Sequence, residues 1–187
     1  MDRAVGDGDL GLSLARGRRP DRGPAGSAAV RPVAGLALVG LTLQESIGGT
    51  SGPLYAVFFL RAAAHLRTDP DRSLTDPVLW AEAFRHGCQG VIELGGAGRG
   101  DRTMLDALMP ACDAFESAVS NGAVVPDALA ASADSAEYGA TETTEMLPRR
   151  GRSSYLGRRA VGHPDPGAPP PPIWLRVVAE ALGVDPD

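Results

Sequence analysis

Apolar residues recur along this chain at helical spacing, and no stretch alternates convincingly as a strand does. Leu79, Trp80, Phe84, Cys88 and Val91 illustrate the pattern, because residues three and four positions apart share one face of a helix. Segments rich in Gly and Pro separate the apolar stretches and indicate turns. We therefore predict an all-α fold, an antiparallel helix bundle or barrel in which alternate loops gather at one end.

The expected elements follow from caps, breakers and periodicity within a single domain, residues 1–187. Asp76, followed by Pro77, and Asp101 are expected to cap helices, and Asn121 with Gly122 to end one. Helices are predicted over 35–47, 53–67, 77–94, 102–120, 126–147 and 173–183. Loops are predicted over 17–34, 68–75, 95–100 and 149–168, with an extended proline run over 169–172.

Charge and composition exclude several classes of function. The net charge of −5 argues against nucleic acid as a main partner. The chain contains no lysine, so a Walker A phosphate loop is impossible and phosphate binding must use metal, backbone amides or Arg. Cys88 and Cys112 lie in apolar stretches and are expected to be buried thiols in a reducing compartment. Without a signal peptide or a long apolar run, we expect a cytoplasmic protein that does not enter a membrane.

Three carboxylates stand close together at the start of the chain. Asp2, Asp7 and Asp9 are interspersed with glycines, which favour a tight backbone that brings the side chains together. Carboxylates without neighbouring His or Cys suit a hard cation such as Mg²⁺. A calcium EF-hand is excluded, because counting Asp7 as its first position places Arg18 where Glu is required. An acidic loop exposed to water is the alternative interpretation.

Two further stretches suit anions. Residues 48–53 (GGTSGP) allow positive φ and close backbone approach, as in an anion-binding nest, or else form an ordinary turn between helices. Residues 149–168 carry five arginines and one aspartate, a composition that suits an oxyanion site or, alternatively, a solvated basic loop. If these loops meet the acidic stretch at one end of the bundle, they supply what phosphoryl transfer requires.

These stretches together resemble subunit L of dihydroxyacetone kinase, the nucleotide-binding part of that enzyme. The likeness rests on residues 2–9 (DRAVGDGD), 48–55 (GGTSGPLY), 100–110 (GDRTMLDALMP), 150–157 (RGRSSYLG) and 162–168 (GHPDPGA). The resemblance implies a barrel of eight antiparallel helices with the nucleotide at one end. This chain starts about one helix later, so we expect seven helices or fewer and an apolar groove left open.

The resemblance also implies a role for individual residues. The metal ligands correspond to Asp2, Asp7 and Asp9, which would hold two Mg²⁺ ions. Nucleotide-binding positions correspond to Leu10, Gly11, Leu12, Ser13, Thr50, Ser51, Gly95, Met104, Arg152, Asp165, Pro166 and Gly167. Of these, Thr50 and Ser51 would meet phosphate, Gly95 and Met104 would flank adenine, and the last three would close the site. Leu10 stands where the family often has His. No catalytic residue is expected on this chain.

The activity implied is transfer of a phosphoryl group, by way of Mg²⁺-bound ADP or ATP, to dihydroxyacetone held on a separate subunit K. In one version of the family, subunit L keeps ADP and is recharged by a phosphocarrier subunit M of the phosphotransferase system. In another, an L domain fused to K exchanges ADP for ATP. We expect the first version. The sequence does not fix the oligomeric state, and a homodimer is one of the assemblies that it allows. The alternatives are a truncated, non-catalytic binding module and a kinase for another small ketose.

Overall fold

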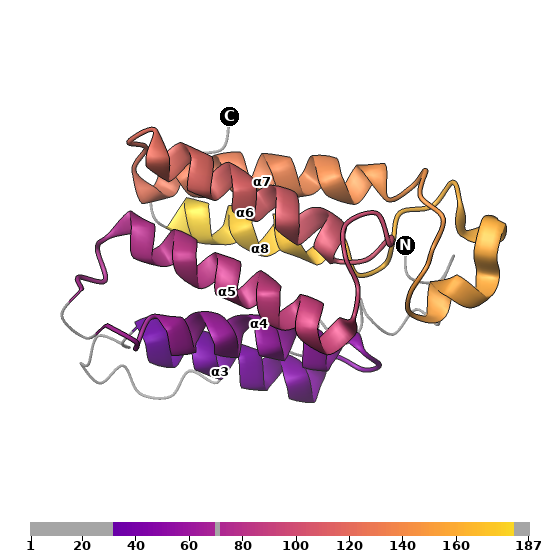
Figure 1. Ribbon diagram of the computed structural model, residues 1–187, viewed down its shortest axis with the longest axis horizontal. Coiled ribbons are helices and arrows are strands. Elements are labelled where there is room, and N and C mark those ends of the chain that lie inside the picture. Colours follow the sequence, from indigo (N-terminus) through magenta and orange to yellow (C-terminus); the bar gives the residue numbers. More distant parts are fainter. Residues whose placement is uncertain (1–31, 70–71, 182–187) are drawn as a thin grey trace.

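The computed structural model describes residues 32–69 and 72–181, and this part of the chain is helical throughout apart from turns and loops (Figure 1). Its elements are α3 (Pro32–Ser46), α4 (Ser51–His65), α5 (Pro77–Gly95), α6 (Leu105–Ser120), α7 (Val125–Glu142), the 3₁₀ helix η1 (Arg152–Ala160) and α8 (Pro170–Ala181). The described ranges contain no strand, which confirms the predicted all-α class.

Each α-helix packs against the next one along the chain from α3 to α7, and α8 packs against α7 and α6 (Figure 1). The short connections between neighbours make the arrangement antiparallel, as predicted. The loops therefore divide between the two ends of the bundle. Among the described helices, none is both long enough and apolar enough to cross a membrane.

Aromatic side chains lie in the middle of the bundle and contact one another there. Phe58 makes edge-to-face contacts with Phe59 and Phe84, at ring-centroid distances of 5.1 Å and 5.4 Å. Trp174 of α8 lies 5.7 Å from Phe58 and 5.5 Å from Phe59, and so joins α8 to α4. These rings border an apolar cavity of about 340 Å³ inside the bundle. Cys88 and Cys112 are buried free thiols, as predicted.

Several helix boundaries differ from those expected. α3 begins at Pro32, so residues 32–34 are helical, while 17–31 lie outside the described residues. Helix α7 ends at Glu142 rather than at 147. The expected extended proline run is instead helical, because Pro170, Pro171 and Pro172 form the first turn of α8. A helix's first N–H groups have no partner within the helix, so prolines there remove no hydrogen bond.

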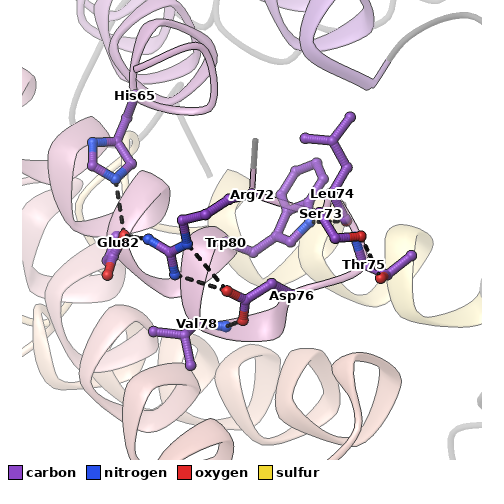
Figure 2. A network of polar contacts seen from close by, with 9 residues as sticks. All are labelled: His65, Arg72, Ser73, Leu74, Thr75, Asp76, Val78, Trp80 and Glu82. Carbon is purple, nitrogen blue, oxygen red and sulfur yellow. Dashed lines mark hydrogen bonds and ion pairs between the residues drawn. The ribbon is translucent and has the colours of Figure 1, made fainter. Parts of the chain in front are cut away.

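The end of the bundle where α5 begins is held by a polar network (Figure 2). The Asp76 carboxylate accepts a hydrogen bond of 2.9 Å from the Val78 N–H, which confirms its predicted N-cap role. Arg72 donates to the same carboxylate and, at 2.6 Å, to Glu82. Glu82 also contacts the His65 ring at 3.2 Å, so the network joins α4, the following loop and α5.

Small residues set the distance between α6 and α7. Gly139 of α7 lies so close to α6 that a Cβ atom there would be 2.1 Å from the Asp106 carbonyl oxygen. We expect Gly139→Ala to destabilise the protein by about 3 kcal/mol, because the obstacle is backbone rather than a flexible side chain. Urea unfolding followed by circular dichroism measures this. Gly98→Ala is the control, since its Cβ would meet open space. Equal stability of the two variants would contradict this account of the α6–α7 packing.

Candidate functional site

A cavity of about 460 Å³ lies at the end of the bundle opposite the network of Figure 2. Five stretches line it: the α3–α4 turn with the start of α4, the end of α5, the α5–α6 loop with the start of α6, the start of η1 with the residues before it, and the loop after η1. These stretches are far apart in the sequence but converge at one end of the helices (Figure 1). The predicted gathering of alternate loops is therefore confirmed for the described part of the chain.

The α3–α4 turn presents hydrogen-bond donors to this cavity. Gly49 adopts φ +68°, a left-handed conformation that favours glycine and lets the chain reverse before α4. Thr50 is the N-cap of α4, and its side chain makes no capping hydrogen bond. The first N–H groups of a helix and its positive dipole end attract anions. Thr50 and Ser51, which both line the cavity, are thus placed where a phosphate group would be stabilised.

Arginine reaches the same turn from η1. The Arg152 Nη2 atom lies 3.3 Å from the position that a Cβ on Gly49 would occupy. Arg150 and Arg152 both line the cavity together with the buried Ser153. A guanidinium group binds phosphate oxygens with two parallel donors, so this side of the cavity also suits an anion.

Another part of the cavity lining is apolar. Leu54, Val91, Leu94 and the buried Met104 contribute to the lining, with Gly95 at the end of α5. Gly96 then ends α5 in a left-handed C-cap with φ +59°. Apolar side chains beside backbone groups and a few charged donors are typical of small-molecule sites. The cavity therefore combines apolar side chains with donors and arginines that suit an anionic ligand.

Aspartates organise the α5–α6 loop, although not as predicted. Asp101 does not cap α6, which begins at Leu105; its carboxylate accepts from the Gly98 N–H at 2.9 Å. The buried Asp106, in the first turn of α6, accepts from the N–H groups of Gly100 and Thr103. The cap prediction was wrong because the chain continues as a loop for three residues after Asp101.

Arg102 is the functional candidate that sequence reasoning missed. It is fully buried, has φ +61°, and lines the cavity. Its guanidinium donates to the carbonyl oxygens of Thr143, Ala160 and His163 at 3.1, 3.1 and 2.7 Å. The Nη1 atom makes no hydrogen bond and lies 3.9 Å from the Asp165 carboxylate. The sequence signal that points to it is its place in the stretch 100–110 (GDRTMLDALMP), which resembles the family.

The loop after η1 is held on the cavity by buried hydrogen bonds. The Asp165 N–H donates to Thr143 Oγ1 at 2.8 Å, and its carboxylate accepts from the Gly167 N–H at 2.9 Å. The Tyr55 hydroxyl, from α4, donates to the Gly167 carbonyl oxygen at 2.7 Å. Burial raises the pKa of Tyr55 well above its usual value, with the Asp165 charge adding to the effect. Asp165, Pro166 and Gly167 thus have a fixed place in the cavity wall.

The structure brings the described members of the predicted nucleotide set together. Thr50, Ser51, Gly95, Met104, Arg152, Asp165, Pro166 and Gly167 all line the one cavity. Leu10, Gly11, Leu12 and Ser13, and the predicted metal ligands Asp2, Asp7 and Asp9, lie outside the described residues. Among the residues that are described, no cluster of three or more His, Cys, Asp or Glu side chains is arranged to hold a metal ion.

Comparison with known proteins agrees with the resemblance seen in the sequence. The family profile of the DAK2 domain matches residues 4–180. The ADP-binding subunit DhaL of the PEP-dependent dihydroxyacetone kinase of Escherichia coli is 39% identical over 183 residues, which cover 97% of this chain and 85% of that subunit. Mouse triokinase/FMN cyclase is 35% identical over 184 residues, 97% of this chain but 31% of that protein.

The fold is also found in solved structures. The dihydroxyacetone kinase of C. freundii superimposes with a TM-score of 0.67 at 29% identity, covering 96% of this chain and 30% of that one. Its complex with AMP-PNP and Mg²⁺ gives a TM-score of 0.61 at 28% identity, covering 96% and 29%. This helical bundle is thus the fold of a class of kinase domain. The chain belongs to the DAK2 domain family, which confirms the resemblance to subunit L.

Removing the Arg102 guanidinium tests its structural role. We expect Arg102→Met to destabilise the protein by about 3–5 kcal/mol, because the buried Asp165 charge and the carbonyl oxygens of the surrounding loops lose their partner. Urea unfolding of both proteins provides the measurement. Arg99→Met is the control, since Arg99 forms an exposed pair with Asp113 and its loss should cost about 1 kcal/mol or less. Equal losses would show that the Arg102 contacts contribute little.

The buried Asp165 carboxyl predicts a pH dependence of stability. Burial raises its pKa to about 6, although N–H donors from Gly167 and Ala168 and the Arg102 charge oppose the shift. The pKa of Asp165 in the folded protein exceeds its usual value of 3.8, so protonation of this carboxyl group stabilises the fold. This stabilisation is fully present below about pH 4. That contribution is lost as pH rises through about 6.

Asp165→Asn removes this titration. We expect the stability of Asp165→Asn relative to wild type to be about 2 kcal/mol more favourable at pH 7.5 than at pH 4.5. Urea unfolding at both pH values measures the difference. Asp127→Asn, at an exposed position at the start of α7, controls for the loss of one carboxylate. A relative stability that does not change with pH would contradict a raised pKa at Asp165.

Proposed function

We propose that this chain is the nucleotide-binding subunit of a dihydroxyacetone kinase, and that its end cavity holds ADP or ATP with Mg²⁺. The observation that carries the proposal is the convergence of the predicted phosphate-binding and adenine-binding residues on one cavity, with Thr50 and Arg152 on the polar side and Met104 on the apolar side. The E. coli relative named as an ADP-binding subunit, which this chain matches over 85% of its length, supports it.

Within this proposal, each side of the cavity has a distinct task. The N-terminus of α4, with Thr50 and Ser51, and the guanidinium of Arg152 bind the phosphates and neutralise their charge. Gly95 and Met104 flank the base. Residues 165–167, fixed by Arg102 and Tyr55, cover the ligand and limit access of water to it. These tasks are positioning and charge stabilisation, and they require no covalent step on this chain.

Magnesium would be held by Asp2, Asp7 and Asp9, two ions in all, and would supply charge neutralisation at the transferred phosphate. Leu10, Gly11, Leu12 and Ser13 would form the adjoining part of the nucleotide site. Two observations support these assignments: the sequence motif at residues 2–9, and the similarity of this chain to the C. freundii kinase, which was solved in complex with AMP-PNP and Mg²⁺. Carboxylate oxygens suit this ion.

The acceptor would be dihydroxyacetone held on a separate subunit K, which the name of the E. coli relative, a subunit of a dihydroxyacetone kinase, supports. The E. coli relative, described as PEP-dependent, favours recharging of bound ADP by a phosphocarrier subunit M over exchange with ATP. A cytoplasmic homodimer is the corresponding assembly. The chain spans only 31% of relatives such as the D-erythrulose kinase of Mycolicibacterium smegmatis, whose name supports another small ketose as the alternative acceptor.

Calorimetry with the intact chain tests the nucleotide site. We expect ADP to bind in the presence of Mg²⁺, with at least about tenfold weaker binding when EDTA removes the metal, because the phosphate charge is then not neutralised. Asp7→Ala should cause a comparable loss, whereas the exposed Asp127→Ala should bind as wild type does.

Absence of Mg²⁺-dependent ADP binding by the wild-type chain would overturn the proposed function. If ADP binds but no phosphoryl transfer to dihydroxyacetone or erythrulose follows when subunit K and a phosphate donor are supplied, the chain is instead a non-catalytic binding module. Varying the ketose in that coupled assay distinguishes the two acceptors.

A further inference from the structure

Part of η1 does not line the cavity and has no predicted role in nucleotide binding. Arg152 and Ser153 line the cavity, but Tyr155, Arg158 and Arg159 do not. The Tyr155 side chain is 88% exposed, the most exposed of the large apolar and aromatic side chains in the described part of the chain. In Figure 1 the orange segment that follows α7 projects beyond the ends of the neighbouring helices.

The backbone that carries Tyr155 is nevertheless anchored at both ends, with a kink at Gly157 (φ +53°) separating Tyr155 from Arg158 and Arg159. Ser153 before it is buried, and Ala160 after it is fully buried with its carbonyl oxygen bonded to Arg102. Ser154 closes the first turn, donating from its N–H and its hydroxyl to the Gly151 carbonyl oxygen at 3.2 Å and 2.7 Å. An exposed tyrosine on a fixed backbone loses little conformational freedom on binding, and tyrosine is frequent among residues that dominate interface energies.

Charge distinguishes this segment from the rest of the surface. Residues 146–164 contain five arginines and no Asp or Glu. Arg150, Arg158 and Arg159 make no ion pair with any described residue, whereas elsewhere Arg61, Arg85 and Arg176 pair with carboxylates. Exposed Leu147 and Val161 add apolar area near the arginines in sequence. The surface therefore combines an aromatic anchor with cations that pair with no described carboxylate, in a chain whose net charge is negative.

Phosphoryl transfer restricts what this surface can contact. The acceptor oxygen must come within about 3–3.5 Å of the phosphorus, so a chain that holds the acceptor must meet this end of the bundle. η1 begins at the cavity wall and extends outward from it. We propose, on the basis of the proposed function, that Tyr155, Arg158 and Arg159 form the docking surface for the acceptor-holding subunit K. The matching surface on K would be an apolar pocket bordered by carboxylates.

Titration of the wild-type chain with subunit K of the same organism, followed by interferometry at saturating Mg²⁺ and ADP, tests the proposal. We expect Tyr155→Ala and the double variant Arg158→Glu/Arg159→Glu each to raise the Kd for K by at least about tenfold. The matched controls are Tyr138→Ala, whose tyrosine is 68% exposed on α7, and Arg67→Glu, on the α4–α5 loop. Neither control should change the Kd more than about twofold.

Calorimetry with ADP separates this proposal from the proposed function, because all four variants should bind Mg²⁺ and ADP as wild type does. The docking proposal is overturned if Tyr155→Ala binds K as Tyr138→Ala does, or if wild type binds ADP but not K. It is also overturned if Tyr155→Ala reduces sedimentation of the chain with phosphatidylglycerol vesicles but does not change the Kd for K. In that case the surface would be a membrane contact. If the wild-type chain does not bind ADP, the proposed function is overturned. The titration with K then still decides the docking surface.

Discussion

A single buried guanidinium connects the parts of this molecule that form the cavity. Arg102 lies in the loop before α6, yet its donors satisfy carbonyl oxygens at the end of α7, at the end of η1 and in the loop that follows η1. Asp165 balances part of its charge from 3.9 Å away. Burying a cation is costly unless it is paired and hydrogen-bonded, so these loops have one favourable arrangement. The cavity wall depends on that arrangement.

Close helix packing brings the remaining walls to the same place. Gly139 lets α7 approach the first turn of α6, where Asp106 holds the N–H groups of the α5–α6 loop. Gly49 reverses the chain so that the uncapped start of α4 faces η1. The bundle therefore supplies rigid supports, and the loops supply the polar groups. This division is common in binding sites, because a packed scaffold can position loop residues without changing itself.

The same end of the molecule has two surfaces with different chemistry. The inner one combines donors for an anion with an apolar wall, and the outer one carries an exposed tyrosine and arginines that pair with no described carboxylate. In the proposed kinase, the inner surface binds Mg²⁺ and nucleotide, and the outer surface of η1 receives the chain that holds the acceptor. Arg152 on the inside and Tyr155 on the outside are three residues apart, so one short segment would couple nucleotide binding to subunit docking.

The sequence by itself determined the helical class, the Asp76 cap, the buried thiols and the loops that line the cavity, because periodicity and turn chemistry are local properties. It also identified Thr50, Met104 and Arg152 through motifs shared with a family. Only the tertiary structure decided that Arg102 is buried, that Asp106 rather than Asp101 holds the α5–α6 loop, and that Pro170–Ala181 is helical from its first proline. The burial of Arg102 depends on carbonyl oxygens 41 to 61 positions away, which no local pattern encodes. The other two outcomes involve neighbouring residues, and there the local pattern allowed more than one cap and more than one helix start.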